Sequence, residues 1–204
     1  MCVTFLPGCM HVQSRITVFH QFPPSFSGTS YAIVPLKDQE GSLEYQSYEQ
    51  VLRQQLNTNG FREMPMEKAD LAVFMSYGID NGRQVVSSSP IYGQTGVASS
   101  STSGNVQAYG NTATYSANTI YTPTYGVVGT DVQSHVEYSR FLKIDMVDRA
   151  SFVEGKIKKL YEGQAISTGQ SGVISAVLPT MIMQMFERFP GKNGSTRKSI
   201  RAVR

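Results

Sequence analysis

The residue with the clearest chemical potential in this sequence is Cys9, which ends the run Leu6-Pro7-Gly8-Cys9 after a short apolar stretch. A small residue such as Gly8 leaves the backbone open to a peptidase, and a thiol can carry a thioether-linked glyceride. The pattern therefore predicts that the segment before Cys9 is removed and that Cys9 is lipidated. The alternative is an unmodified thiol in a cytosolic protein.

Both cysteines, Cys2 and Cys9, lie within the first nine residues. The processed protein would keep only an acylated Cys9, so we expect neither a disulfide nor a cysteine-based metal site. The pattern at Cys9 is similar to the lipobox of bacterial lipoproteins. The segment 1–5 has no basic residue and is shorter than the roughly 7 to 15 apolar residues of a signal peptide, so we expect an upstream start codon.

The three histidines do not form a pattern that binds metal. His11, His20 and His135 are far apart in the sequence, and no pair has the short spacing of ligands on one helix or hairpin. We therefore expect structural roles for all three, and neither a metal ion nor a cofactor.

Three carboxylates are candidates for acid–base catalysis. Asp145 and Asp148 flank a predicted strand end, and Glu137 lies eight residues before Asp145 on the same strand. Glu137 and Asp145 share a strand face by parity, and glycosidase chemistry needs two carboxyl groups about 5 to 9.5 Å apart. Aspartates are more common in turns, and Asp148-Arg149 suits the turn after this strand. The sequence therefore favours a structural role.

Other candidate motifs are incomplete. The run 169–172 (Gly-Gln-Ser-Gly) lacks the last glycine of a nucleophile elbow, so a helix N-cap explains Ser171 better. Gly191-Lys192 lacks the rest of a phosphate loop. Methionines 181, 183 and 185 have helical spacing, which predicts a core position rather than an adaptable binding face.

Composition limits the partners of this 204-residue chain. The five basic residues from Lys192 onward have no acid among them, and the rest holds 13 basic and 15 acidic residues, a net charge of −2. A weakly acidic body argues against nucleic-acid binding. We expect residues 192–204 to form a solvated basic tail, with contact to anionic lipid or peptidoglycan as the alternative.

The segment from Gly82 to Thr130 has an unusual composition, because Arg83 is its only charged residue and Ser, Thr, Gly, Asn and Tyr dominate. It has too few aliphatic residues for a core of its own, which predicts a mobile arm or a long solvated hairpin. Such a segment can pair with itself or with another chain. Its candidate interaction residues are Tyr109, Tyr115, Tyr121 and Tyr125.

The remaining pattern predicts one α+β domain over residues 10–191, with residues 1–9 as a leader remnant and an insert at about 84–130. We expect an antiparallel or mixed β-sheet with two helices packed on one face, in the order strand, strand, helix, four strands, helix. The expected strands are 16–22, 31–36, 70–79, 84–92, 132–147 and 156–168. The expected helices are 43–59, with Ser42 as cap and Gly60 after its end, and 171–189, divided at Pro179. Asn81-Gly82 predicts a hairpin turn between 70–79 and 84–92, and Arg140, on an otherwise apolar face, is expected near an edge.

These motifs, in this order, resemble the bacterial envelope lipoproteins that carry domain of unknown function 4136. The resemblance covers most of residues 16–191 outside the insert, and its motifs after Cys9 are Tyr31-Ala32-Ile33, Gly60-Phe61, Ala69-Asp70-Leu71, Leu142-Lys143-Ile144-Asp145 with Asp148, Leu160-Tyr161-Glu162-Gly163 and Phe189-Pro190-Gly191. Tyr161 stands where this group usually has Trp. The resemblance implies a lipid-anchored periplasmic domain and brings no catalytic residues.

We therefore expect a non-enzymatic envelope lipoprotein that acts in interaction or assembly, held to the membrane through Cys9. Met10 follows Cys9 where an inner-membrane retention signal would have Asp, so we expect the periplasmic face of the outer membrane. Partners would be other envelope proteins or peptidoglycan. The alternative is a periplasmic hydrolase or small-ligand-binding protein that uses the strand-end carboxylates. The sequence leaves the partner, the oligomeric state and the order of the insert open.

Overall fold

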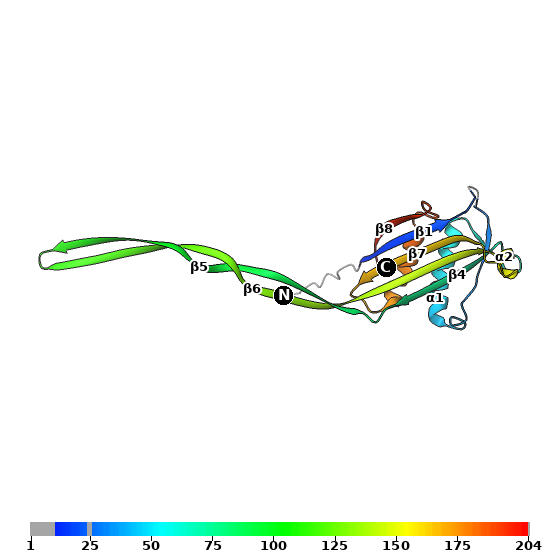
Figure 1. The fold of residues 1–204 in the computed structure, drawn as a ribbon, viewed down its shortest axis with the longest axis horizontal. Helices are drawn as coiled ribbons and strands as arrows, with labels where there is room; N and C mark the ends of the chain where they lie inside the picture. The colour runs from blue at the N-terminus through cyan, green and yellow to red at the C-terminus, as the bar shows by residue number, and fades with distance from the viewer. Residues whose placement is uncertain (1–10, 24–25, 204) are drawn as a thin grey trace, which may run out of the picture. The chain divides into compact units, whose positions relative to one another are not determined.

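The computed structural model describes residues 11–23 and 26–203, so Cys9 and the predicted lipobox lie outside the described residues. The chain divides into two compact units (Figure 1). The first, named the body, comprises the described parts of 1–83 and 136–204, and the second, named the arm, comprises 84–135. Each is described by itself.

The body contains a mixed sheet with the strand order β3-β2-β4-β6-β7-β1-β8. Its strands are β1 (His11–His20), β2 (Ser30–Ile33), β3 (Arg62–Glu63), β4 (Leu71–Ile79), the second part of β6 (Thr112–Asp148), β7 (Lys159–Gly169) and β8 (Ser195–Ala202). Strand β2 is parallel to β3 and β4, and the other neighbours in the body are antiparallel. Side chains alternate between the faces, so one face of β1 buries Val12, Ile16 and Val18.

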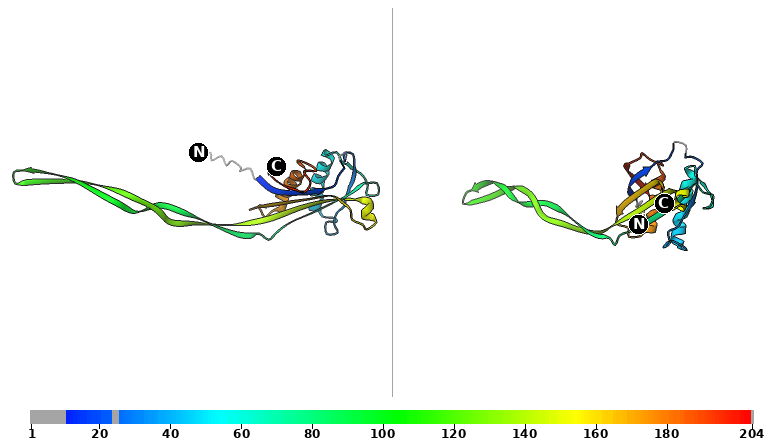
Figure 2. Two further views of the ribbon diagram at one scale, coloured as in Figure 1. Left: turned by 45° about the horizontal axis from the view of Figure 1, so that its top comes forward. Right: turned by 45° about the vertical axis from the view of Figure 1, so that its right-hand side comes forward.

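Two longer helices cover this buried face, α1 (Leu43–Thr58) and α3 (Leu178–Phe186), and Figure 2 shows them on the same side of the sheet. Ser42 caps α1, because its Oγ accepts a hydrogen bond from Tyr45 N at 3.2 Å. Gly60, with φ of 89°, follows the C-terminal end of α1, where only glycine adopts this conformation without strain. The expected apolar stripe of α1 is confirmed, since Tyr45, Tyr48, Leu52 and Leu56 are all buried.

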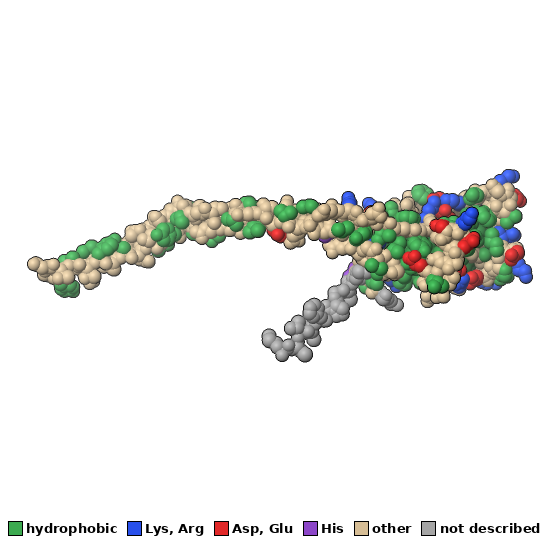
Figure 3. Space-filling view, turned by 90° about the horizontal axis from the view of Figure 1, so that it is seen from below, with side chains coloured by type: hydrophobic (Ala, Val, Ile, Leu, Met, Phe, Trp, Pro, Cys, Tyr) green, Lys and Arg blue, Asp and Glu red, His purple; other side chains and the backbone are tan. Residues whose placement is uncertain are grey.

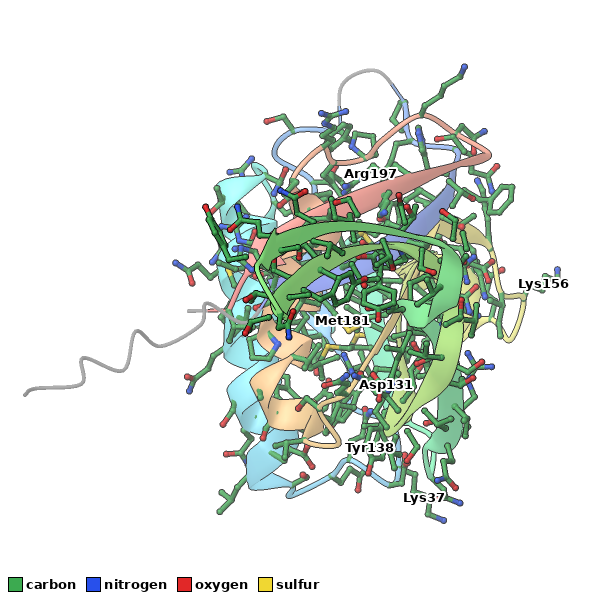
Figure 4. The ribbon with its side chains drawn as sticks, turned by 90° about the vertical axis from the view of Figure 1, so that its left-hand side faces the viewer. Lys37, Asp131, Tyr138, Lys156, Met181 and Arg197 are labelled. Atoms are coloured by element: carbon green, nitrogen blue, oxygen red, sulfur yellow. The ribbon has the colours of Figure 1, made fainter. Side chains whose placement is uncertain are left out.

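The core lies between these helices and the sheet. Leu142, Ile144 and Met146 of β6 are fully buried, and they meet Met181 and Met185 of α3 in the same apolar cluster. Figure 4 shows Met181 between α3 and the strands. The core role predicted for Met181 and Met185 is confirmed, while Met183 is half-buried.

The predicted α+β class with a mixed sheet is confirmed, but the number and order of elements differ. Residues 149–153 form a short helix, α2 (Arg149–Val153), where a turn was expected, and Asp148 caps it by accepting from Ser151 N at 2.9 Å. Residues Ile174–Ala176 form a 3-10 helix, and Pro179 lies in the first turn of α3, as expected. The expected strand 84–92 is the beginning of a much longer strand, β5 (Arg83–Tyr109).

The expected solvated tail was wrong. Residues 195–202 form the edge strand β8, antiparallel to β1 with Ile16 opposite Arg197. Arg197 Nη2 donates to the carbonyl oxygen of Gln184, and Arg201 Nη1 donates to Glu187 Oε1 at 3.0 Å. A cluster of basic residues is typical of a solvated segment, whereas here the long side chains of Arg197 and Arg201 cover the end of α3.

The prediction of a hairpin turn at Asn81-Gly82 was also wrong. Strand β4 pairs with β6, where Ile79 lies opposite Arg140, and β5 pairs with β6 rather than with β4. Asp80 explains the difference, because its Oδ1 accepts hydrogen bonds from Gly82 N at 3.0 Å and Ser139 N at 2.9 Å. These bonds lower the pKa of Asp80 and fix a local turn that does not bring β5 back onto β4.

The arm is one two-stranded hairpin, formed by β5 and the first part of β6. Its strands are joined by two residues, Gly110 and Asn111, and Gly110 has the positive φ of 59° that such short loops require. Thr102 and Thr119 face each other with 2.9 Å between their Oγ1 atoms. The insert is therefore paired with itself along its length.

Candidate functional sites

The candidate tyrosines of the arm are all exposed, with exposed fractions of 81% at Tyr109, 66% at Tyr115, 63% at Tyr121 and 73% at Tyr125. Tyr115 lies over Gly104, where an added Cβ would come within 2.8 Å of the ring. Thr102 and Thr119 share that face of the ribbon, so by parity Tyr121 and Tyr125 also lie on it. The arm thus has one face with aromatic rings over small residues.

The other face of the arm carries hydroxyls together with Tyr109 and exposed aliphatic side chains such as Ile91 and Ile120. Thr95 and Thr124 meet there with 3.2 Å between their Oγ1 atoms, and the same parity places Ser99, Ser101 and Ser116 on it. None of residues 84–135 is buried, and none from 84 to 130 carries a charge. In Figure 3 the visible face of the arm is almost entirely free of Lys, Arg, Asp and Glu colours. From residue 84 to 130 the arm therefore offers hydroxyls, rings and main-chain edges, and Asp131 is the first acid after this stretch.

The described histidines do not form a catalytic or metal site. His20 Nε2 lies 3.1 Å from the carbonyl oxygen of Gly191, and His11 lines a cavity that is described below. His135 belongs to the arm. No group of three His, Cys, Asp or Glu among the described residues could hold a metal ion.

The carboxylates Glu137 and Asp145 do not form a catalytic pair. Eight residues of one strand separate them, which corresponds to about 26 Å at about 3.3 Å per residue. Glu137 accepts a hydrogen bond from Arg83 Nη2 at 2.6 Å, and this bond raises the pKa of Arg83. Asp145 forms ion pairs with Lys143 at 3.5 Å and Lys159 at 3.0 Å. Each acid is thus neutralised by its own partners.

Around Asp145 the outer face of the sheet has a cavity of about 310 Å³. Phe74 and Phe152 line it, with ring centroids 5.4 Å apart, and Lys143 and Lys159 lie at its rim. The hydrogen bond from Lys143 lowers the pKa of Glu162, which also contacts Lys159. The four charged groups compensate one another, so this cavity carries no unbalanced charge.

Ser171 does not cap a helix as expected. Its Oγ accepts from Val173 N at 3.3 Å, two residues along, and the 3-10 helix that follows has no side-chain cap. Neither a histidine nor an acid hydrogen-bonds to Ser171 within the described part of the chain. Ser171 thus supports a local turn and lines the same cavity as His11.

The prediction that Arg140 lies near an edge was wrong. Strand β6 has β4 on one side and β7 on the other, and Arg140 is only 3% exposed. Arg140 lines the cavity with His11 and Ser171. The sequence does show a charged residue on an otherwise apolar strand face. The alternation of residues alone does not show what packs against that face.

Tyr161, which replaces a Trp of the resembled group, is 1% exposed and packs against Phe22 and Phe189 with ring centroids 6.1 and 5.0 Å away. Burial raises the pKa of Tyr161. Its hydroxyl has no hydrogen-bond partner among the described residues. Tyr161 therefore serves as an aromatic core residue.

The family described as "Domain of unknown function (DUF4136)" matches residues 17–191. No curated protein matches the chain. A similar solved structure is the crystal structure of a PDZ domain protein from Parabacteroides distasonis ATCC 8503, with 10% sequence identity and a TM-score of 0.47. The match covers 94% of this chain and 39% of that one, so the chain spans about two fifths of that protein.

Proposed function

The chain belongs to the DUF4136 family, and from this premise we propose that it is a non-enzymatic, lipid-anchored domain of the bacterial cell envelope that acts in interaction or assembly. The observation that carries the proposal is the arm, a long hairpin with no buried residue from 84 to 135 and no charged residue from 84 to 130. Such a segment adds nothing to a core, so its surface and edges are what it contributes.

The two edges of the arm favour a protein partner. Each edge of a two-stranded ribbon presents unpaired N–H and C=O groups, and proteins usually protect such edges with charged residues. The arm has none from 84 to 130, although Pro90 and Pro123 each remove one donor. The proposed occupant is an extended strand of another envelope protein, which would pair with an edge of the arm through main-chain hydrogen bonds.

The aromatic face adds contact area to this pairing. The rings of Tyr115, Tyr121 and Tyr125 are exposed, and tyrosine provides large contact areas with little loss of conformational entropy. Each ring also has a hydroxyl that remains able to hydrogen-bond at a polar interface. The face is therefore suited to a protein surface rather than to a charged polymer.

Cys9 is the proposed anchor. Among the described residues no helix is long and apolar enough to cross a membrane. Each buried methylene of an acyl chain contributes about 0.8 kcal/mol, and two chains give stable attachment where one does not. Because Met10 is not Asp, the proposed location is the periplasmic face of the outer membrane.

Labelling tests the anchor. Radiolabelled palmitate should enter the wild-type protein and not the Cys9→Ala variant, with Cys2→Ala as the matched control that keeps the label. A mature protein that still begins at Met1 and carries no fatty chain would contradict this part of the proposal.

A shortened hairpin tests the arm. Thr95 lies opposite Gly126, where an added Cβ would be 3.1 Å from the threonine methyl group, in the same register as Thr102 and Thr119. Residues 96–125 can therefore be replaced by Asn-Gly, which closes a two-residue turn. We expect the proteins crosslinked to the wild-type chain in intact envelopes to be lost from this variant, whose body still folds. The same partners on the shortened chain would exclude the arm as the contact.

A further inference from the structure

Arg140 is a charged residue in the interior of the body. It lies on β6 between Ile79 of β4 and Ser167 of β7, and it belongs to the face that buries Leu142 and Ile144. Its exposed fraction is 3%, close to that of the core residues around it. A guanidinium keeps its charge in proteins, so this position needs an explanation.

The guanidinium has no adequate partner among the described residues. Nε and Nη2 make no hydrogen bond, and Nη1 has only Ser167 Oγ at 3.5 Å, which is the outer limit of a hydrogen bond. The acids whose charge reaches Arg140 are already engaged, since Asp80 accepts from two backbone amides and Glu137 from Arg83. Burial lowers the pKa of Arg140. An uncompensated buried charge costs several kcal/mol.

A cavity of about 290 Å³ adjoins this side chain. Ser171 and the segment Thr168–Gln170 line its wall, and strand alternation turns the Thr168 side chain to the face opposite Arg140. Gly169 lets the guanidinium pack closely against the backbone of β7, because a Cβ there would lie 3.0 Å from Nη2. Tyr138 supports the same wall, since a Cβ at Gly172 would lie 2.9 Å from its ring; Figure 4 labels Tyr138.

The unpartnered nitrogens define the ligand chemistry. Nε and Nη2 lie on one edge of the planar guanidinium, where their two N–H groups point in parallel and match the two oxygens of a carboxylate. We propose that this cavity binds a small organic molecule through its carboxylate, with Arg140 as the bidentate donor and the Ser171 hydroxyl as a further hydrogen-bonding group. The cavity is at the lower end of the size range of small-molecule sites.

Binding of a carboxylate in this cavity requires a local change of conformation. Neither Nε nor Nη2 is accessible to water in this structure, so the segment 169–171 or the Arg140 side chain has to shift when the carboxylate enters. The site is independent of the arm and of the anchor, because it uses only residues of the body.

Nuclear magnetic resonance of the full chain provides the test, with N-acetylglycine as the probe and its uncharged amide, N-acetylglycinamide, as the matched control at equal ionic strength. We expect N-acetylglycine to shift the Arg140 Nε–H resonance in a saturable manner and the amide to leave it unchanged. Each charge-assisted hydrogen bond contributes about 1.5 to 3 kcal/mol, so Arg140→Gln should bind at least about tenfold more weakly.

Two further variants keep the test decisive if Arg140→Gln fails to fold. Gly169→Ala should weaken binding because its methyl group takes the space beside Nη2, whereas Arg197→Gln, which alters an arginine outside this cavity, should leave binding unchanged. The proposal is overturned if the wild-type resonance does not move up to the solubility limit of N-acetylglycine, if the amide moves it equally, or if Gly169→Ala binds as the wild type does.

Discussion

The body and the arm are both built largely of β-strands, but different forces hold them. Among the described residues of the body, 23 buried apolar residues from strands and helices form one cluster, whereas residues 84–135 contribute none. The arm has only its main-chain hydrogen bonds, side-chain contacts such as Thr102–Thr119 and rings such as Tyr115 over Gly104. A two-stranded hairpin of this kind is only marginally stable in water. The comparison indicates that buried apolar packing stabilises the body, whereas the arm contributes exposed surface.

The largest expected difference is in truncations of apolar side chains. Ile144→Ala removes a fully buried side chain and should lower the free energy of unfolding by about 2–5 kcal/mol. Ile120→Ala in the arm, where the side chain is 66% exposed, should change it by less than about 0.5 kcal/mol. Urea unfolding of both variants measures this, and equal losses would contradict the comparison.

A smaller difference is expected for hydrogen bonds of side chains. Ser42→Ala removes the cap of α1 and should cost about 1 kcal/mol, because Tyr45 N loses its acceptor. Thr102→Ala removes an exposed pair in the arm and should be close to neutral. Thermal unfolding compares the two, and a larger loss for Thr102→Ala would show that the arm takes part in the cooperative unit.

Removal of the Tyr161 hydroxyl should raise the free energy of unfolding of the body or leave it unchanged. The hydroxyl is buried and has no partner in the described part of the chain, so Tyr161→Phe should stabilise the body by up to about 1 kcal/mol or leave it unchanged. Tyr121→Phe is the control in the arm and should not alter stability. Destabilisation by Tyr161→Phe would mean that the hydroxyl has an interaction absent from this structure.

The smallest expected effect is a pH dependence that belongs to the body alone. Hydrogen bonds from Ser30 lower the pKa of Asp70 below its ordinary value, so the contribution of Asp70 to stability is complete above that value and is lost as the pH falls through the lowered one. Asp70→Asn should therefore reduce the loss of stability between neutral and acidic pH. The shortened arm should leave the dependence unchanged, because the removed segment has no acid.

Much of the body could be predicted from local patterns. The stripe of α1, its Ser42 cap, Gly60 and the first-turn Pro179 all follow from local chemistry and were confirmed. The order of strands was not predictable in this way, because the pairing of β4 with β6 and of β8 with β1 joins segments far apart in the sequence. Asn81-Gly82 does not form the predicted hairpin turn, because the Asp80 carboxylate accepts a hydrogen bond from Gly82 N and stabilises a different local turn.

The candidate sites divide in the same manner. Low charge and polar-aromatic composition were sufficient to identify the arm as a separate segment, and Tyr115 and Tyr121 are exposed there. The Arg140 cavity was missed because it needs β6, β7 and the segment before α3 together. A single charged residue on an apolar strand face can be recognised from the sequence. Whether that residue adjoins a cavity can be seen only in the tertiary structure.

The proposed function depends most on the arm being the part of the molecule that contacts the partner. A photoreactive amino acid at position 121 in the arm, compared with one at exposed position 15 on β1 in the body, tests this in intact cells. We predict a specific crosslinked protein from position 121 and none from position 15. Crosslinks from position 15 with none from position 121 would contradict the account.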